Sequence, residues 1–240
     1  MESITINKNV LRFGYYSSIL LAVFTFIAFG LGMMAVPPAG PYCPGDCFGY
    51  PYLDSLSHFP KDYYWMYFAV FQIIIYVVFM ISVHFIAPPD KKINSFTGVS
   101  FGLIAAVVLL SDYFVQFAVV PISLIKGEEE GIALLTQYNG HGTFIALEEL
   151  GYVMMSLSFL FIAAVFSRQS GLGRILRWIL IIPILLIILF FIFYSIRYGI
   201  DRSYRFEVAA IGVNWFALII VGILAAIVFK RKLKKENGGS

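Results

Sequence analysis

The sequence predicts an all-α membrane protein: a polytopic bundle of six transmembrane helices. Hydrophobic residues make up 60% of the chain and charged residues only 13%, whereas a soluble domain is about half apolar and about a quarter charged. The mean hydropathy is +0.85. Apolar stretches of membrane-spanning length recur along the chain, so we expect lipid to be its main solvent.

Each predicted span meets the length that a bilayer requires, which is about 20 apolar residues for a hydrocarbon core of roughly 30 Å. Six segments reach this length: 15–36, 64–87, 96–119, 144–166, 179–196 and 208–229. They leave no room for a separate soluble domain, so we expect one transmembrane domain over residues 1–240 that ends in a flexible basic tail at 230–240. Pro183 is expected to bend the fifth span.

The charged residues predict the orientation of the bundle. Lys and Arg gather before the first span, in the second and fourth connections and after the last span, and an even number of spans places all four segments on one side. Asp and Glu gather in the first and third connections, on the other side. Because basic loops stay in the cytoplasm, we expect a multi-pass protein of the cell membrane with both termini cytoplasmic (N-in/C-in). The net charge of +3 therefore reflects topology, and nucleic acid is not expected as a partner.

Two cysteines lie in the first outer connection, in the segment Cys43-Pro-Gly-Asp-Cys47. The Pro-Gly pair favours a tight turn that brings the ends of this segment together. The outer face of a membrane permits disulfides, so we expect a Cys43–Cys47 bond. A redox-active pair or a soft-metal site remains the alternative, although two sulfurs without nearby histidines make a poor metal site.

Polar residues inside the spans point to a functional site, because an ionisable side chain in hydrocarbon is costly and marks such a site by default. The outer parts of four spans contain polar residues: Gln72, Asp112, Gln116, Glu148, Glu149, Tyr152 and Asn214. At about 1.5 Å per residue, Glu148 and Glu149 lie roughly 8 Å below the outer end of their span. Asn214 lies about 10 Å and Gln72 about 12 Å below the ends of theirs. Scattered residues would not share a depth, so we expect one polar pocket in the outer leaflet.

Within this pocket the carboxyl groups are the candidates for chemistry, because they cost more to bury than amides. Asp112 paired with Glu148 or Glu149 forms the candidate catalytic set for acid–base chemistry. The alternative is structural: polar groups inside membranes also hydrogen-bond across helices and hold a bundle together.

The remaining polar residues are candidates for ligand binding. His141 lies seven residues before Glu148 and is expected to cover the pocket, while Arg197 or Arg205 is expected to balance the buried negative charge. Asn214 shares a helix face with Glu207, seven residues earlier. The other ligand-binding candidates are Gln72, Gln116 and Tyr152.

Several specific chemistries lack their sequence signatures. The chain has no His-Glu-x-x-His motif and no phosphate-binding glycine-rich loop before a helix, and no Ser/His pair is marked by its spacing. Its histidines are spread over both predicted sides of the membrane, where His58 is expected to be solvated and His84 interfacial. We therefore expect no metal site and no cofactor.

Three segments together resemble a known family. The stretch from Gln137 to Tyr152, QYNGHGTFIALEELGY, is similar to a hallmark of an uncharacterised family of six-span integral membrane proteins of bacteria and archaea. The segments 112–116 and 59–67 are similar to that family as well. Its members often carry proline where this chain has Gly140. The resemblance covers most of the chain and implies a fold and a topology, but no activity.

Three functions remain open from the sequence. The first is a protein that binds or transforms a lipid-like or small amphipathic molecule at an outer-leaflet acidic pocket. The second is a small proton- or cation-coupled transporter, since buried carboxyl groups suit proton relays. The third is a non-catalytic accessory or assembly subunit. Membrane lipids are the expected partners in each case, and no protein partner is indicated.

Overall fold

The chain is an all-helical bundle. The computed structural model describes residues 7–35, 38–167 and 169–238, and this part of the chain contains no strand. Six of its helical segments are long and apolar enough to cross a membrane, which confirms the predicted number of spans. Their main helices are α1 (Lys8–Met34), α2 (Tyr64–Phe85), α3 (Lys92–Ala118), α6 (Thr143–Ile162), α7 (Gly171–Tyr198) and α8 (Tyr204–Gly238).

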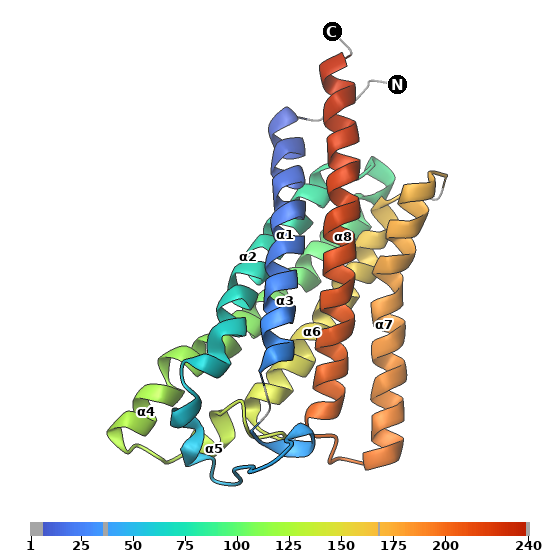
Figure 1. Ribbon diagram of the computed structural model, residues 1–240. Helices are drawn as coiled ribbons and strands as arrows, with labels where there is room; N and C mark the ends of the chain where they lie inside the picture. Colours follow the sequence, from blue (N-terminus) through green and yellow to red (C-terminus); the bar gives the residue numbers. More distant parts are fainter. Residues whose placement is uncertain (1–6, 36–37, 168, 239–240) are drawn as a thin grey trace.

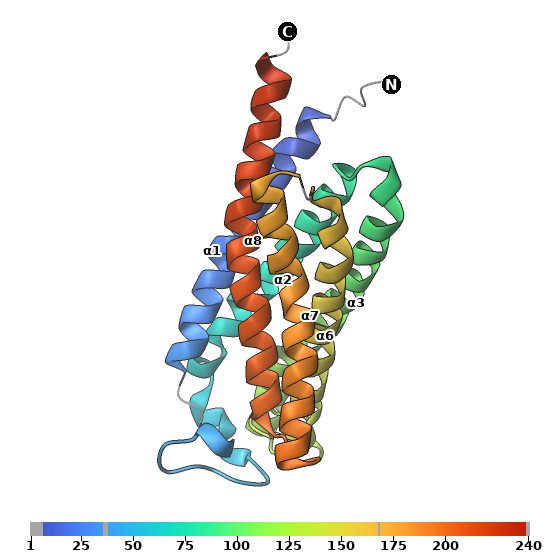
Figure 2. The same ribbon diagram turned by 90° about the vertical axis from the view of Figure 1, so that its right-hand side faces the viewer.

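The long helices run side by side, alternating in direction (Figures 1 and 2). Helix α1 begins and α8 ends at the same end of the bundle, which we call the terminal end. Helix α1 packs most closely on α2 and α8, and α3 packs on α6. Helix α7 lies at the periphery against α6 and α8. Its exposed face is a row of Ile, Leu and Phe side chains that suits contact with lipid.

The opposite end, which we call the loop end, is closed by short helices. Helix α4 (Val120–Lys126) follows α3 directly. The next residue, Gly127, has a φ of 71°, a left-handed conformation that glycine adopts at little cost. After it come α5 (Ile132–Leu135) and the loop that leads into α6, while η1 (Gly40–Tyr42), η2 (Leu53–His58) and η3 (Lys61–Tyr63) connect α1 to α2. Figure 1 shows α4 and α5 at this end, away from the two chain ends.

Two further short helices connect the spans at the terminal end. They are η4 (Pro89–Lys91), between α2 and α3, and η5 (Ala163–Val165), which extends α6. The connections at the terminal end are therefore short and partly helical.

Several helices extend beyond the spans expected from the sequence. Helix α1 begins at Lys8, because the Asn7 side chain caps it by accepting a hydrogen bond from the Asn9 N–H at 2.9 Å. Helix α8 continues through the basic segment as far as Gly238, where the sequence suggested a flexible tail. Lys, Arg and Glu are good helix formers, so an apolar helix can continue into water through them. Helix α7 also continues through Pro183.

Small residues allow the helices to approach closely. A Cβ atom added to Gly222 on α8 would lie 2.6 Å from the Ser18 carbonyl oxygen on α1 and 2.9 Å from the Ala22 Cβ. A Cβ added to Gly14 would clash with the ring of Phe229, at 2.2 Å from its nearest atom. Close backbone approach at small residues is a main source of helix association in membranes. The α1–α8 contact therefore depends on these two glycines.

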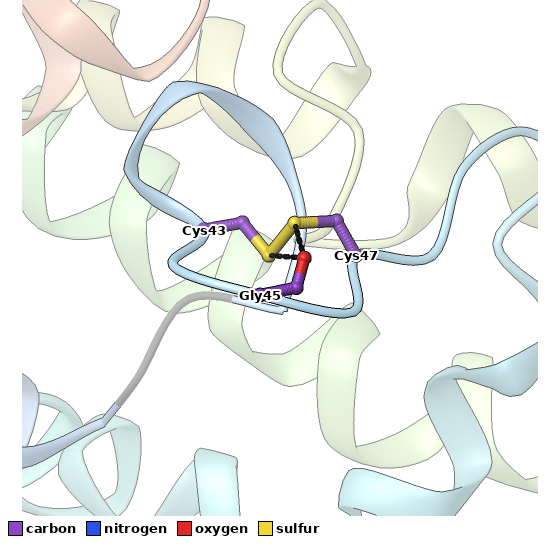
Figure 3. The surroundings of a disulfide bond; sticks show 3 residues. All are labelled: Cys43, Gly45 and Cys47. Atoms are coloured by element: carbon purple, nitrogen blue, oxygen red, sulfur yellow. Dashed lines mark hydrogen bonds between the residues drawn. A yellow bond between two sulfur atoms is a disulfide. The ribbon is translucent and has the colours of Figure 1, made fainter.

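The first loop is closed by the predicted disulfide. Cys43 and Cys47 are bonded, with their Cα atoms 6.0 Å apart. Figure 3 shows the Gly45 carbonyl oxygen pointing at both sulfurs, 2.9 Å from Sγ of Cys47. The bond holds the loop that follows η1 in a compact turn.

The packing at Gly222 can be tested by adding one methyl group. Gly222→Ala is expected to lower the free energy of unfolding by about 1–3 kcal/mol, because α8 must move away from the α1 backbone. Gly30→Ala is the matched control on α1, since nothing lies within 4 Å of its added Cβ, and it is expected to be neutral or stabilising by up to about 1 kcal/mol. Thermal unfolding of both variants in the same lipid nanodiscs measures the difference. Equal melting temperatures would contradict the close α1–α8 contact.

Candidate functional site

Four carboxyl groups from three helices gather near the loop end. Asp112 comes from α3, Glu148 and Glu149 from α6, and Glu207 from α8; we call them the four-acid cluster. Asp112, Glu148 and Glu207 are only 2%, 0% and 6% exposed. Asp112 interacts electrostatically with Glu148, and Glu207 interacts with the other three. The structure therefore places together the acids that the sequence analysis put at one depth, and it adds Glu207.

A chain of hydrogen bonds ends at Glu148. The Tyr113 hydroxyl donates to Glu148 Oε1 at 2.6 Å, and the Tyr113 and Tyr152 hydroxyls are 2.9 Å apart. The Trp215 indole N–H donates to the Tyr152 hydroxyl at 2.9 Å. With Glu148 ionised, the single proton of Tyr113 is used on Glu148, so Tyr152 must donate to Tyr113. Three donors in series then support negative charge on Glu148.

Asn214 fastens two helices to each other. Its Oδ1 accepts from the Ser156 hydroxyl at 3.0 Å, and its Nδ2 donates to the carbonyls of Tyr152 at 3.3 Å and Ala210 at 2.9 Å. Both ends of the amide are thus bonded. Asn214 therefore connects α8 to α6, seven residues along α8 from Glu207 of the four-acid cluster.

Other polar atoms in this region have no partner. Within the part of the chain that the structure describes, buried oxygens without a hydrogen-bond partner include Asp112 Oδ2, Glu148 Oε2 and Glu207 Oε2. Both amide atoms of Gln72 on α2 are also buried and unpartnered there. Buried polar atoms are nearly always hydrogen-bonded, so these oxygens call for a proton, a water molecule or a ligand.

The counter-charge comes from Arg202. Its Nη2 lies 3.5 Å from Glu149 Oε2, and its guanidinium group lies over the ring of Phe191 at 4.7 Å. The sequence pointed instead to Arg197 or Arg205. The structure places both of these over the ring of Tyr198, at 5.3 and 4.2 Å. Glu149–Arg202 is the one ion pair of the four-acid cluster within the described segments.

A cavity of about 360 Å³ lies beside Glu207. Its walls come from the last turns of α1, the first turns of α2 and α8, and the loop before α6; we call it the α1–α8 cavity. Most of its wall is apolar, with Phe29, Met33, Trp65, Phe144, Ile211 and Trp215 among the lining residues. The polar lining residues are Asp62, Gln137, Tyr138, Tyr204 and Glu207.

The polar edge of the cavity is fixed by hydrogen bonds within the loop end. The Tyr138 hydroxyl donates to Asp62 Oδ2 at 3.3 Å, and His58 Nδ1 lies 2.9 Å from the same oxygen. Burial raises the pKa of Tyr138 above its ordinary value, so this residue remains a donor at neutral pH. The Tyr204 hydroxyl donates to the Gln137 carbonyl at 3.2 Å. This edge is therefore preformed.

Three sequence candidates lie outside the four-acid cluster. Gln116 donates to the Leu135 carbonyl at 2.6 Å and accepts from the Gln137 N–H at 3.0 Å, so it holds the loop after α5. His141 has an exposed side chain and does not line the α1–α8 cavity. Gln72 is buried on α2.

Sequence reasoning missed the residues that complete the site. Glu207 was visible only as a partner of Asn214 on one helix face, and its position at the first turn of α8 suggested a solvated loop residue. Tyr113 and Trp215 are ordinary interior residues in sequence, and only the packing of α3, α6 and α8 gives their polar atoms a role. Arg202 could not be told from its neighbouring arginines.

The described residues contain no group of three or more His, Cys, Asp or Glu side chains that could hold a metal ion. His84 instead contacts the Ser95 hydroxyl at 2.8 Å near the terminal end. His58 contacts Asp62 at the loop end.

A scan against models of protein families finds no family that matches the chain, and comparisons with curated proteins and with solved structures find no match either. The family resemblance drawn from the sequence therefore stays a prediction.

The hydrogen bond to Glu148 can be tested by removing one hydroxyl. Tyr113→Phe is expected to lower the free energy of unfolding by about 1–3 kcal/mol, because Glu148 Oε1 then lacks its donor in a buried place. Tyr16→Phe on α1 is the matched control, since Tyr16 is 62% exposed and such a change is expected to fall within about 0.5 kcal/mol. Thermal unfolding gives both values. Equal losses in the two variants would mean that the hydrogen bond does not support the fold.

Proposed function

We propose that this multi-pass membrane protein binds a small amphipathic, lipid-like molecule in the α1–α8 cavity. The apolar part of the ligand lies against the walls from α1 and α8, and its polar head faces Glu207. One observation carries this proposal: a buried carboxyl group with an unpartnered oxygen lines a cavity whose wall is otherwise mainly apolar.

The size and lining of the cavity support binding. Its volume of about 360 Å³ falls within the range of about 300–1,000 Å³ typical of small-molecule sites. Such sites combine apolar walls with a few well-placed polar groups, as Glu207, Asp62 and Tyr138 are placed here. Asp112, Glu148 and Glu149 do not line the cavity, so the geometry favours binding over acid–base chemistry on the ligand.

The other two functions have less support. A proton- or cation-coupled transporter needs polar residues that continue towards the terminal end. Beyond the Tyr76–Ser158 hydrogen bond, however, the buried residues of α2 are Phe79, Met80, Ser82 and Val83, and the Ser82 hydroxyl donates to the Val78 carbonyl of its own helix. A purely structural subunit predicts a dry and fully paired polar cluster. The unpartnered acid oxygens and the adjoining cavity weigh against that reading.

The orientation in the membrane is part of the proposal. The terminal end carries the basic residues of η4, of the first turns of α7 and of the last turns of α8, and we propose that it faces the cytoplasm. The α1–α8 cavity would then lie in the outer leaflet.

This orientation predicts which residues a membrane-impermeant maleimide reaches in intact cells. In a background without Cys43 and Cys47, Glu129→Cys is expected to react and Gln169→Cys is expected to react only after the cells are opened. Both positions are exposed and lie at opposite ends of the bundle. The reverse pattern would invert the proposed topology.

Binding can be measured by fluorescence quenching. Trp65 and Trp215 line the cavity and Trp178 lies on α7, so Trp178→Phe leaves two tryptophans that report on the cavity. In nanodiscs of phosphatidylcholine, ω-bromoundecanol is expected to quench their emission with saturation, because its bromine enters the cavity with the alkyl chain.

A cavity-filling variant provides the control for quenching from bulk lipid. Gly212 lines the cavity, and nothing lies within 4 Å of a Cβ added there. Gly212→Leu is therefore expected to fill the space and abolish the saturable component, whereas Gly30→Leu, which also has open space but lies outside the cavity lining, is expected to retain it. Identical quenching in both variants and in the parent protein would refute binding in this cavity.

A further inference from the structure

We infer that the α1–α8 cavity selects an amphiphile with a positively charged head, such as a primary amine or a quaternary ammonium group on an alkyl chain. This inference depends on the proposed function and names the chemical class of its ligand. It is carried by Glu207, which is buried, lines the cavity and has an unpartnered Oε2.

The charges around Glu207 leave a deficit of positive charge. Glu207 is hydrogen-bonded to Glu148, which requires one proton between the two carboxyl groups, and it also interacts with Glu149 and Asp112. All of these neighbours are acids, so the Glu148–Glu207 pair still has one negative charge without a cation beside it. Arg202 contacts Glu149 and stacks on Phe191, so its positive charge is paired with Glu149 and not with Glu207. Buried charges in proteins are normally paired. A cationic head at Glu207 would supply the missing partner, while an anionic head would add to the repulsion.

The walls next to Glu207 also suit a cation. Trp65, Trp215, Tyr138, Tyr204 and Phe144 line the same cavity. The faces of aromatic rings attract cations, and aromatic cages are the usual receptors for quaternary ammonium groups. A neutral hydroxyl head would gain little from these rings, so the combination of acid and aromatics favours a cation.

Of the two acids that line the cavity, Glu207 is the one available to bind the charged head of the ligand. Asp62 also lines the cavity, but its Oδ2 is already bonded by Tyr138 and His58. Glu207 lies on the first turn of α8, where its carboxyl group joins the cavity to the four-acid cluster. The cation would therefore bind at the boundary between the two.

Three probes with the same chain and different heads test this inference on the Trp178→Phe protein. They are ω-bromoundecyltrimethylammonium, ω-bromoundecanol and ω-bromoundecanoate, each measured in phosphatidylcholine nanodiscs. The quenching left in Gly212→Leu is subtracted for each probe, which removes differences in bulk partitioning. The ammonium probe is expected to saturate at a concentration at least about tenfold below that of the alcohol, and the carboxylate is expected to be the weakest.

The Glu207→Gln variant tests whether the preference for the ammonium probe depends on the carboxyl group of Glu207. The substitution keeps the size of the side chain and removes its charge, so it is expected to abolish the advantage of the ammonium probe over the alcohol. An ammonium advantage that persists in Glu207→Gln would overturn the role assigned to Glu207. The comparison of the three probes on the parent protein uses no change in the acids, so it remains decisive if Glu207→Gln does not fold.

The two proposals fail in different ways. If the alcohol and ammonium probes bind the parent protein equally, the selection of a cation is wrong and binding of an amphiphile stands. If none of the three probes quenches the parent protein more than Gly212→Leu, the proposed function itself is wrong.

Discussion

Hydrocarbon cannot solvate an ionised carboxyl group, and this constraint governs the loop end of the bundle. Asp112, Glu148 and Glu207 can lie at this depth only because other protein groups replace water around them. The Trp215–Tyr152–Tyr113 chain does so for one oxygen of Glu148, and Arg202 does so for Glu149. One buried oxygen each of Asp112, Glu148 and Glu207 remains without a protein hydrogen-bond donor, and of these three residues only Glu207 lines the cavity.

The packing of α1 on α8 explains how the cavity and a tight helix contact coexist. Around Gly222 the two backbones approach so closely that no Cβ fits between them. Towards the loop end the same helices carry Phe29, Met33, Val208 and Ile211, which line open space. One helix pair thus provides both a rigid contact and an apolar wall. The short helices between α1 and α2 and the disulfide loop close the structure beyond that wall.

The sequence was sufficient for the number of spans, because each span depends only on a local run of apolar residues. The sequence was also sufficient for the Cys43–Cys47 bond, because the short turn between the two cysteines brings them together. The depth argument grouped Asp112 with Glu148, since depth follows from the rise per residue, and the structure brings these two side chains within electrostatic reach. The rotation of each helix about its axis depends on packing between distant segments. For that reason the sequence alone could not distinguish Gln116, which holds a loop, from Glu207, which faces the cavity, or Arg202 from Arg197 and Arg205.

The order of donors in the aromatic chain limits how protons can move through this protein. An indole nitrogen carries a hydrogen but offers no lone pair to accept another, so Trp215 terminates the row of hydroxyl groups. Hopping from Glu148 through Tyr113 and Tyr152 therefore leads to a dead end. The interior carboxyl groups can instead exchange protons on two other sides: at Glu207, which lines the α1–α8 cavity, and at Glu149, whose side chain is 18% exposed.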